Sequence, residues 1–314
     1  MKFAFVMDPI ERINPEKDTT FVLMLEAQER GHENFYLELK DLFVRDGIPF
    51  GHMAQVQVRR GKKYYTLGRR QTAPVTIMDG IFMRKDPPLS LDYIFATYIL
   101  SLASQNSFII NDPKGLREAN EKMYILNFPE AIPPTIVSKD IARIKGFLEE
   151  VGGEIVIKPL FGCGGYSVFY THKEDKNLNS LLELMTREGT EYIMAQKFLP
   201  EYRRGDKRII MLDGEPIGAT LRVPRPDELR GNIHVGGVCH KTTLTKRDRY
   251  LCSIVGPRLK KDGLYFVGLD VIGDYITEIN VTSPTGVQEI DRLNKTNLEA
   301  KVIDFVEKRV KERR

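Results

Sequence analysis

The chain has 314 residues, of which 42% are hydrophobic and 29% charged, and its formal net charge is +4. These values are typical of a globular protein with two or three packed units. No apolar run approaches the roughly 18 residues that a membrane span requires, the first residues are apolar over too short a stretch for a secretory signal, and the charge is too mild to imply nucleic acid. Three cysteines without CxxC spacing argue against a disulfide framework or a zinc site and favour a reducing cytoplasm.

The first 121 residues predict strands that alternate with helices. We expect helices at 19–30, closed by Gly31, and at 89–104. Strands are expected at 2–7, 34–39, 80–84 and 108–111, with an inserted β-ribbon at 56–67. Such alternation favours a parallel sheet wrapped by helices, and therefore an α/β unit.

The remainder of the chain predicts an α+β arrangement rich in antiparallel strands. Helices are expected at 141–151, 179–188 and 245–261, and strands at 154–159, 166–172, 192–196, 207–212 and 215–223. Asp213-Gly214 is a strong hairpin signal, and Thr296 to Glu299 has capping-box spacing at the start of a final helix. The polar segment 224–240 is expected to be a mobile lid. We therefore expect three domains: 1–121, a central lobe at 122–200 and a C-terminal lobe at 201–314.

One predicted hairpin, 268–285, carries three oxygen-bearing side chains among apolar residues. Strand alternation places Glu278 and Asn280 on one face. A two-residue turn would set Asp270 opposite Thr277, whereas a three-residue turn would set it opposite Glu278 and place Asn280 opposite Gly268. The second arrangement would gather the oxygen ligands that Mg²⁺ requires, and the alternative is an exposed hairpin with solvated polar residues.

A glycine turn at 162–165 lies between two predicted strands. It lacks the Lys-Ser/Thr pair of a Walker loop, and a strand rather than a helix follows it. It fits a flap whose backbone N–H groups fold over phosphates, with Lys158 on the strand that leads into it. By itself this signal is weak. Cys163 fits a small spacer better than a nucleophile.

Two further stretches suggest ligand contacts. Residues 194–199 could present backbone groups to an adenine edge, although an ordinary buried strand fits them equally well. Arg208 is expected to point inward, where it needs a carboxylate or phosphate partner. The arginines between 203 and 230 suggest an anionic ligand, with a solvated basic surface or a non-catalytic nucleic-acid-binding module as alternatives.

The order of several motifs resembles the ATP-grasp superfamily. They are NEK (120–122), IVIKPLFGCGG (155–165), MAQKFLP (194–200), GDKRIIMLDGEP (205–216), RGN (230–232) and VGLDVIGDYITEINVTSPT (267–285). More closely, MDP (7–9), FMRKDPP (82–88), ATYIL (96–100) and the TEINVTSPT ending are similar to the bacterial type of glutathione synthetase. The resemblance implies an ATP-grasp fold that follows an N-terminal Rossmann-like parallel-sheet domain.

The resemblance also implies a role for each matching residue. Arg208 would lie beside the transferred phosphoryl group, and Arg222 and Arg230 near the acyl substrate and on the lid. ATP would be bound by Lys122, Lys158, the flap residues Gly164 and Gly165, and the adenine connector Ala195, Gln196, Lys197 and Phe198. Metal ligands would be Asp270, Glu278 and Asn280, and substrate contacts Asp8, Arg84, Thr282, Ser283 and Thr285. Phe161, Pro226-Asp227 and Gly286 depart from the family pattern.

The activity implied by the resemblance is ATP-dependent joining of γ-glutamylcysteine and glycine through an acyl phosphate. Two Mg²⁺ or Mn²⁺ ions would act with ATP, and the partners would be these small molecules, with neither nucleic acid nor membrane. The family also implies a cytoplasmic homotetramer. Another ATP-grasp ligase that accepts a different amine is the main alternative.

Overall fold

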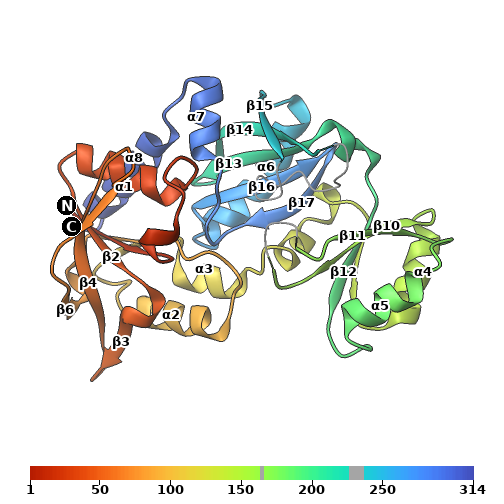
Figure 1. Cartoon of the computed structure of the whole chain (residues 1–314), viewed down its shortest axis with the longest axis horizontal. Helices are drawn as coiled ribbons and strands as arrows, with labels where there is room; N and C mark the ends of the chain where they lie inside the picture. The colour runs from red at the N-terminus through yellow and green to blue at the C-terminus, as the bar shows by residue number, and fades with distance from the viewer. Residues whose placement is uncertain (163–165, 226–236) are drawn as a thin grey trace.

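The computed structural model describes residues 1–162, 166–225 and 237–314, and within them the chain forms three sheets of eight, four and five strands (Figure 1). Each sheet is built largely from one stretch of the chain, in the order of the three expected domains. The exact domain boundaries stay a prediction. None of the helices in these ranges is long and apolar enough to cross a membrane.

The first sheet has a parallel centre, as predicted. β1 (Lys2–Val6) pairs with β2 (Glu33–Leu37) and β7 (Gly80–Met83), and β7 pairs with β8 (Phe108–Ile110). The helices α1 (Thr19–Glu29) and α2 (Leu91–Ser101) begin where Asp18 and Ser90 accept hydrogen bonds from backbone N–H groups of the first turn.

An antiparallel extension makes this sheet larger than the sequence suggested. The long strand β4 (Ile48–Val58) pairs with β2, β3 (Leu42–Arg45), β5 (Tyr65–Leu67) and β6 (Gln71–Pro74). The predicted ribbon at 56–67 covers only the end of β4 and β5. β3 and β6 were missed because short strands made of residues such as Gln71–Pro74 carry little periodic signal.

The central sheet is entirely antiparallel, in the order β11-β10-β12-β9. Its strands are β9 (Thr135–Ser138), β10 (Glu154–Pro159), β11 (Phe169–His172) and β12 (Ile193–Lys197), and α4 (Ile141–Glu150) and α5 (Leu178–Thr186) pack against it. On the right of Figure 1 it forms a separate lobe. The predicted strand at 166–172 begins only at Phe169, because Tyr166 and Ser167 lie in a turn.

The third sheet has the order β15-β14-β13-β16-β17. Its strands are β13 (Asp206–Leu212), β14 (Glu215–Val223), β15 (Val238–Lys241), β16 (Phe266–Ile272) and β17 (Tyr275–Asn280), and α6 (Lys246–Lys261) precedes β16. The predicted Asp213-Gly214 turn is confirmed, with positive φ angles of 50° and 83° at its two residues. The end of the expected lid, 238–240, belongs to β15.

The end of the chain returns to the first sheet. α3 (Pro113–Glu118) and α7 (Val287–Asn294) were not predicted, and α8 (Leu298–Lys311) packs on α1 and β8. The predicted capping box at Thr296 is wrong, because the Asn297 side chain caps α8 while the Thr296 hydroxyl donates to Asp291. Asn111, directly after β8, bonds to the backbone of Phe266 and Val281, which ties the first sheet to the third.

Candidate active site

The hairpin β16–β17 brings Asp270, Glu278 and Asn280 together. Its turn is the two-residue Gly273-Asp274, because Ile272 pairs with Tyr275. Thr277 then forms a β-bulge, since Val271 pairs with Ile276 whereas Asp270 pairs with Glu278. Because of the bulge, Asp270 pairs with Glu278 although the turn has two residues, a pairing that we expected only from a three-residue turn. Asn280 lies opposite Gly268.

The neighbouring strands contribute two arginines that share Asp270. Arg208 on β13 donates from Nε and Nη2 to the two Asp270 oxygens, at 2.6 and 3.2 Å. Arg222 on β14 contacts Asp270 at 2.9 Å and also donates to Asp206. Gly268 leaves room for this network, because a Cβ there would lie within 3.0–3.2 Å of the Arg208 side chain. The inward Arg208 therefore has the carboxylate partner that the sequence required.

Burial and these arginines act in opposite directions on the carboxylates. Burial tends to raise the pKa of Asp270, but Arg208 and Arg222 outweigh it and lower the pKa to about 2. For Asp206 burial dominates and raises the pKa to about 6, although Arg222 opposes it. Asp270 is therefore ionised at neutral pH, with both of its oxygens paired to the two arginines.

The two lysines predicted to bind phosphate both contact residues of the central lobe. Lys122 contacts Glu278 at 3.4 Å and donates to the Gly162 carbonyl at 2.9 Å. Lys158 donates to Gln196 at 2.6 Å, and Gln196 in turn donates to Thr135. Lys122 thus joins the hairpin of the third sheet to the start of the predicted flap. The flap residues Gly164 and Gly165 and the lid residue Arg230 lie outside the described residues.

The predicted adenine connector is the end of β12 and the residue after it. Ala195 is buried in the core of the central lobe, while Lys197 is exposed. The backbone amides of Lys197 and Phe198 donate to Pro134 and Glu154. The Phe198 ring packs 4.6 Å from that of Tyr170. A role in binding adenine stays a prediction for these residues.

A cavity of about 620 Å³ lies between the hairpin and the first sheet. The predicted residues that line it are Asp8, Arg208, Arg222, Glu278, Asn280, Thr282, Ser283 and Thr285. Arg12, Asn14, Lys17, Asp18, Asp86, Glu121 and Glu289 are among the others. The wall therefore carries charges of both signs, contributed by segments more than 200 residues apart in the sequence.

Arg84 occupies a different place from the other predicted substrate contacts. It is buried and is not part of the cavity wall. Its guanidinium donates to the Thr20 hydroxyl and, at 2.9 Å, to the Pro284 carbonyl. In this position it supports the loop that carries Thr282 and Thr285 from behind, and contact with a substrate stays a prediction.

Sequence reasoning missed Glu121, although it lies next to Lys122. Its Oε1 accepts hydrogen bonds from the Val281 and Thr282 amides and, at 2.8 Å, from the Thr282 hydroxyl. Burial, followed by the nearby charge of Glu278, raises the pKa of Glu121 to about 7. Its place in the NEK motif was the only signal, because its partners lie about 160 residues away.

The donor atoms of the hairpin fit a hard cation. The described residues contain no group of three or more His, Cys, Asp or Glu side chains arranged to hold a metal. The hairpin instead offers two carboxylates and one amide, and Mg²⁺ commonly binds one or two carboxylates while phosphates and water complete its shell. Glu278 is the more open carboxylate, with one fifth of its side chain exposed.

Comparison with known proteins identifies the family. A model of the prokaryotic glutathione synthetase N-terminal domain matches residues 1–117, and one of the ATP-grasp domain of the same enzymes matches 121–295. The chain belongs to the prokaryotic glutathione synthetase family. Glutathione synthetases from Synechocystis sp. and Brucella melitensis are 47% and 44% identical to it, and each alignment covers 98% of this chain and 99% of the relative.

Solved structures agree on the fold of this glutathione synthetase family member. The D-cycloserine synthetase DcsG superimposes with a TM-score of 0.67 over the full length of both chains, at 14% identity. The ATP-grasp ligase PsnB, complexed with its precursor peptide PsnA2 and AMPPNP, gives 0.62 over 99% of this chain and 98% of PsnB, also at 14% identity. The expected ATP-grasp fold is therefore confirmed.

Proposed function

We propose that the chain is an ATP-dependent ligase that joins γ-glutamylcysteine and glycine to give glutathione, ADP and phosphate. The observation that carries this proposal is the cavity in which Arg208, Arg222 and Glu278 face Thr282 and Thr285. The choice of substrates rests on the relatives, because the chain is 42–47% identical over nearly its whole length to curated glutathione synthetases.

The reaction requires activation of a carboxylate, which is a poor electrophile. The carboxylate of γ-glutamylcysteine that will be joined to glycine attacks the γ-phosphorus of ATP. The bond from that phosphorus to the bridging oxygen breaks, and ADP leaves. The glycine nitrogen then attacks the acyl carbon, loses a proton, and phosphate departs. Arg208, held by Asp270 and by the Thr285 carbonyl, would offset the charge on the transferred group.

Asp270, Glu278 and Asn280 would hold Mg²⁺ or Mn²⁺. Such ions, when bound with ATP, neutralise the charge of its phosphates. Lys122 and Lys158 would bind those phosphates from the side of the central lobe. The positive partners of Asp270 keep this carboxylate ionised, as a metal ligand must be.

The cavity wall suits substrates that carry both charges. γ-Glutamylcysteine and glycine each have an ammonium and at least one carboxylate group. Arg12 and Lys17 can pair with the carboxylates, and Asp8, Asp18 and Asp86 with the ammonium groups. We further propose that segment 224–240 with Arg230 excludes water from the acyl phosphate. Cytoplasmic location and tetramer formation stay predictions.

Release of ADP, measured with each substrate omitted in turn, tests this function. With ATP and Mg²⁺, we expect ADP release to require both γ-glutamylcysteine and glycine, and mass spectrometry to detect glutathione in equal amount. A faster reaction with another amine in place of glycine would instead support an ATP-grasp ligase with a different acceptor. ADP release without any acyl substrate would contradict the proposal.

A further inference from the structure

The segment between β17 and α7, residues 281–285, forms one wall of the active-site cavity. It has neither helical nor strand structure, and Thr282, Ser283 and Thr285 line the cavity. We call it the substrate loop, after the predicted substrate contacts that it carries. Because such a segment has no ladder of backbone hydrogen bonds of its own, its backbone groups need partners from other parts of the chain.

Three buried charged side chains from distant parts of the chain hold the substrate loop. Arg84 donates to the Pro284 carbonyl at 2.9 Å, and Arg208 donates to the Thr285 carbonyl at 3.0 Å. Both arginines also bond to side chains outside the loop. Glu121 differs from them, because within the described parts of the chain the hydrogen bonds of its carboxylate all come from this loop.

Glu121 fixes the start of the loop through four hydrogen bonds. Its Oε1 accepts from the amides of Val281 and Thr282, at 3.2 and 3.3 Å, and from the Thr282 hydroxyl at 2.8 Å. Its backbone carbonyl accepts from the Ile279 amide at 3.0 Å, which aligns residue 121 beside the end of β17. Since Glu121, Val281 and Thr282 are all buried, water cannot easily replace a lost acceptor, and the unpaired N–H groups would be costly.

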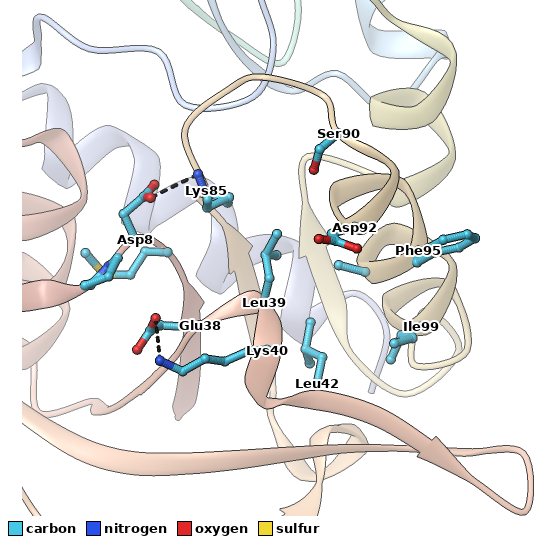
Figure 2. Close-up of a pocket in the computed structure, with 13 residues that line it drawn as sticks. Asp8, Glu38, Leu39, Lys40, Leu42, Lys85, Ser90, Asp92, Phe95 and Ile99 are labelled. Carbon is cyan, nitrogen blue, oxygen red and sulfur yellow. Dashed lines mark hydrogen bonds and ion pairs between the residues drawn. The ribbon is translucent and has the colours of Figure 1, made fainter.

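The wall of the cavity on the side of the first sheet is held in a different way. Asp8 pairs with Lys85 at 2.9 Å (Figure 2), and it also accepts from the Asp86 amide. These residues follow β1 and β7, which pair with each other, so this wall is fixed within one sheet. The substrate loop instead follows β17, an edge strand of the third sheet, and its first residues depend on Glu121, which comes from outside that sheet.

We propose that Glu121 is a positioning residue, which holds the substrate loop in the shape that binds the two amino-acid substrates; the choice of these substrates rests on the proposed function. The role requires an acceptor oxygen at the right distance from the loop. It does not require a negative charge, which is unfavourable here because the charge of Glu278 lies nearby. The alternative is that Glu121 acts through its charge, by attracting the ammonium group of a substrate.

Two variants of Glu121 separate reach from charge. Glu121→Gln keeps the length of the side chain and an acceptor oxygen, whereas Glu121→Asp keeps the charge and draws the carboxylate back by one methylene group. In the ADP-release assay of the full-length protein, we expect Glu121→Asp to raise the KM of γ-glutamylcysteine, of glycine or of both by about tenfold or more. The KM of ATP should hardly change, and Glu121→Gln should keep wild-type KM values.

Hydrogen exchange followed by mass spectrometry tests the loop without using the reaction. Peptides that cover 281–286 should exchange faster in Glu121→Asp and at the wild-type rate in Glu121→Gln. Asp248→Glu is the matched control, because Asp248 is a buried carboxylate that accepts from the Thr245 amide outside the cavity wall. It should lower the melting temperature but change neither the KM values nor exchange in 281–286.

The reverse order of the variants, with Glu121→Asp active and Glu121→Gln impaired, would overturn the proposal in favour of a role for the charge. Unchanged exchange in 281–286 of Glu121→Asp would overturn it as well. Should Glu121→Asp fail to fold, Thr282→Val, which removes the 2.8 Å bond, takes its place in the exchange measurement with the same expected result. A wild type without substrate-dependent ADP release would refute the proposed function, while exchange would still decide whether Glu121 holds the loop.

Discussion

Asp270 and Glu278 lie opposite each other in one hairpin, yet their surroundings differ. Asp270 is buried, and both of its oxygens accept hydrogen bonds, from Arg208, Arg222 and Asn280. Glu278 is more open and, among the residues that the structure describes, has one ion-pair contact, with Lys122 at 3.4 Å. A buried carboxylate between two arginines contributes to the folded state, because each charge would be costly without the others. An open carboxylate beside a cavity is available for a ligand.

We predict that Glu278→Gln will lower ADP release by about 100-fold or more, because a metal ligand would be lost, while thermal unfolding hardly changes. Asp274→Asn is the control, since Asp274 lies exposed in the turn of the same hairpin, and it should keep wild-type turnover. The assay is substrate-dependent ADP release beside a melting curve. Wild-type turnover in Glu278→Gln would refute the metal assignment.

Asp270→Asn is predicted to behave differently from Glu278→Gln. It leaves Arg208 and Arg222 buried without their shared carboxylate, which should reduce the free energy of unfolding by about 3 kcal/mol. Urea unfolding, followed by circular dichroism, measures this change, with Glu278→Gln as the internal comparison. Equal stability of the two variants would show that the arginines do not depend on Asp270.

At the scale of elements, the sequence predicted whether a segment is a helix, strand or turn better than it predicted which strand residues pair. The parallel strands of the first sheet, the Asp213-Gly214 turn and helices such as α6 follow from periodicity and turn residues. The pairing of Asp270 with Glu278 does not, because it depends on the bulge at Thr277, whose hydroxyl donates to the Asp270 carbonyl within the folded sheet. Glu121 was missed, and the contact of Arg84 with Pro284 was not predicted, for a related reason, since their partners are distant in sequence.

The corner between α7 and α8 offers a pH-dependent prediction. Burial, and then a hydrogen bond to Asp291, raise the pKa of Glu299 to about 8 from the 4.5 of a free glutamate. The protonated form is therefore favoured by folding. Its contribution to stability is complete below about pH 4.5 and is lost as the pH rises through about 8.

Glu299→Gln keeps a neutral side chain that can donate to Asp291. Its melting temperature should equal that of the wild type near pH 5 and exceed it increasingly towards pH 9. Glu312→Gln, at the exposed end of the same helix, is the control and should show no such divergence. Melting curves at pH 5, 7 and 9 give the answer, and parallel pH profiles for wild type and Glu299→Gln would contradict a raised pKa.

At the scale of the whole molecule, the three sheets do not share one core equally. Buried side chains of the first and third sheets and of α8 merge into two large clusters that run across both sheets. The helix side of the central sheet has a small cluster of its own, built from α4, α5, β10 and β12. This lobe carries Lys158 and joins one of the large clusters through Met194 of β12, so we expect its helix side to open more readily than the other two sheets.

Local unfolding of the central lobe should therefore be separable from global unfolding. Leu182 on α5 and Leu259 on α6 are both fully buried helical leucines, one in the small cluster and one in a large cluster. Either change to alanine should cost about 3 kcal/mol. In hydrogen exchange followed by mass spectrometry, Leu182→Ala should accelerate exchange in 135–197 alone, whereas Leu259→Ala should accelerate it in β13 and β16. Equal acceleration in β13 and β16 by Leu182→Ala would mean that the chain unfolds as one cooperative unit, and that lobe opening needs the whole core.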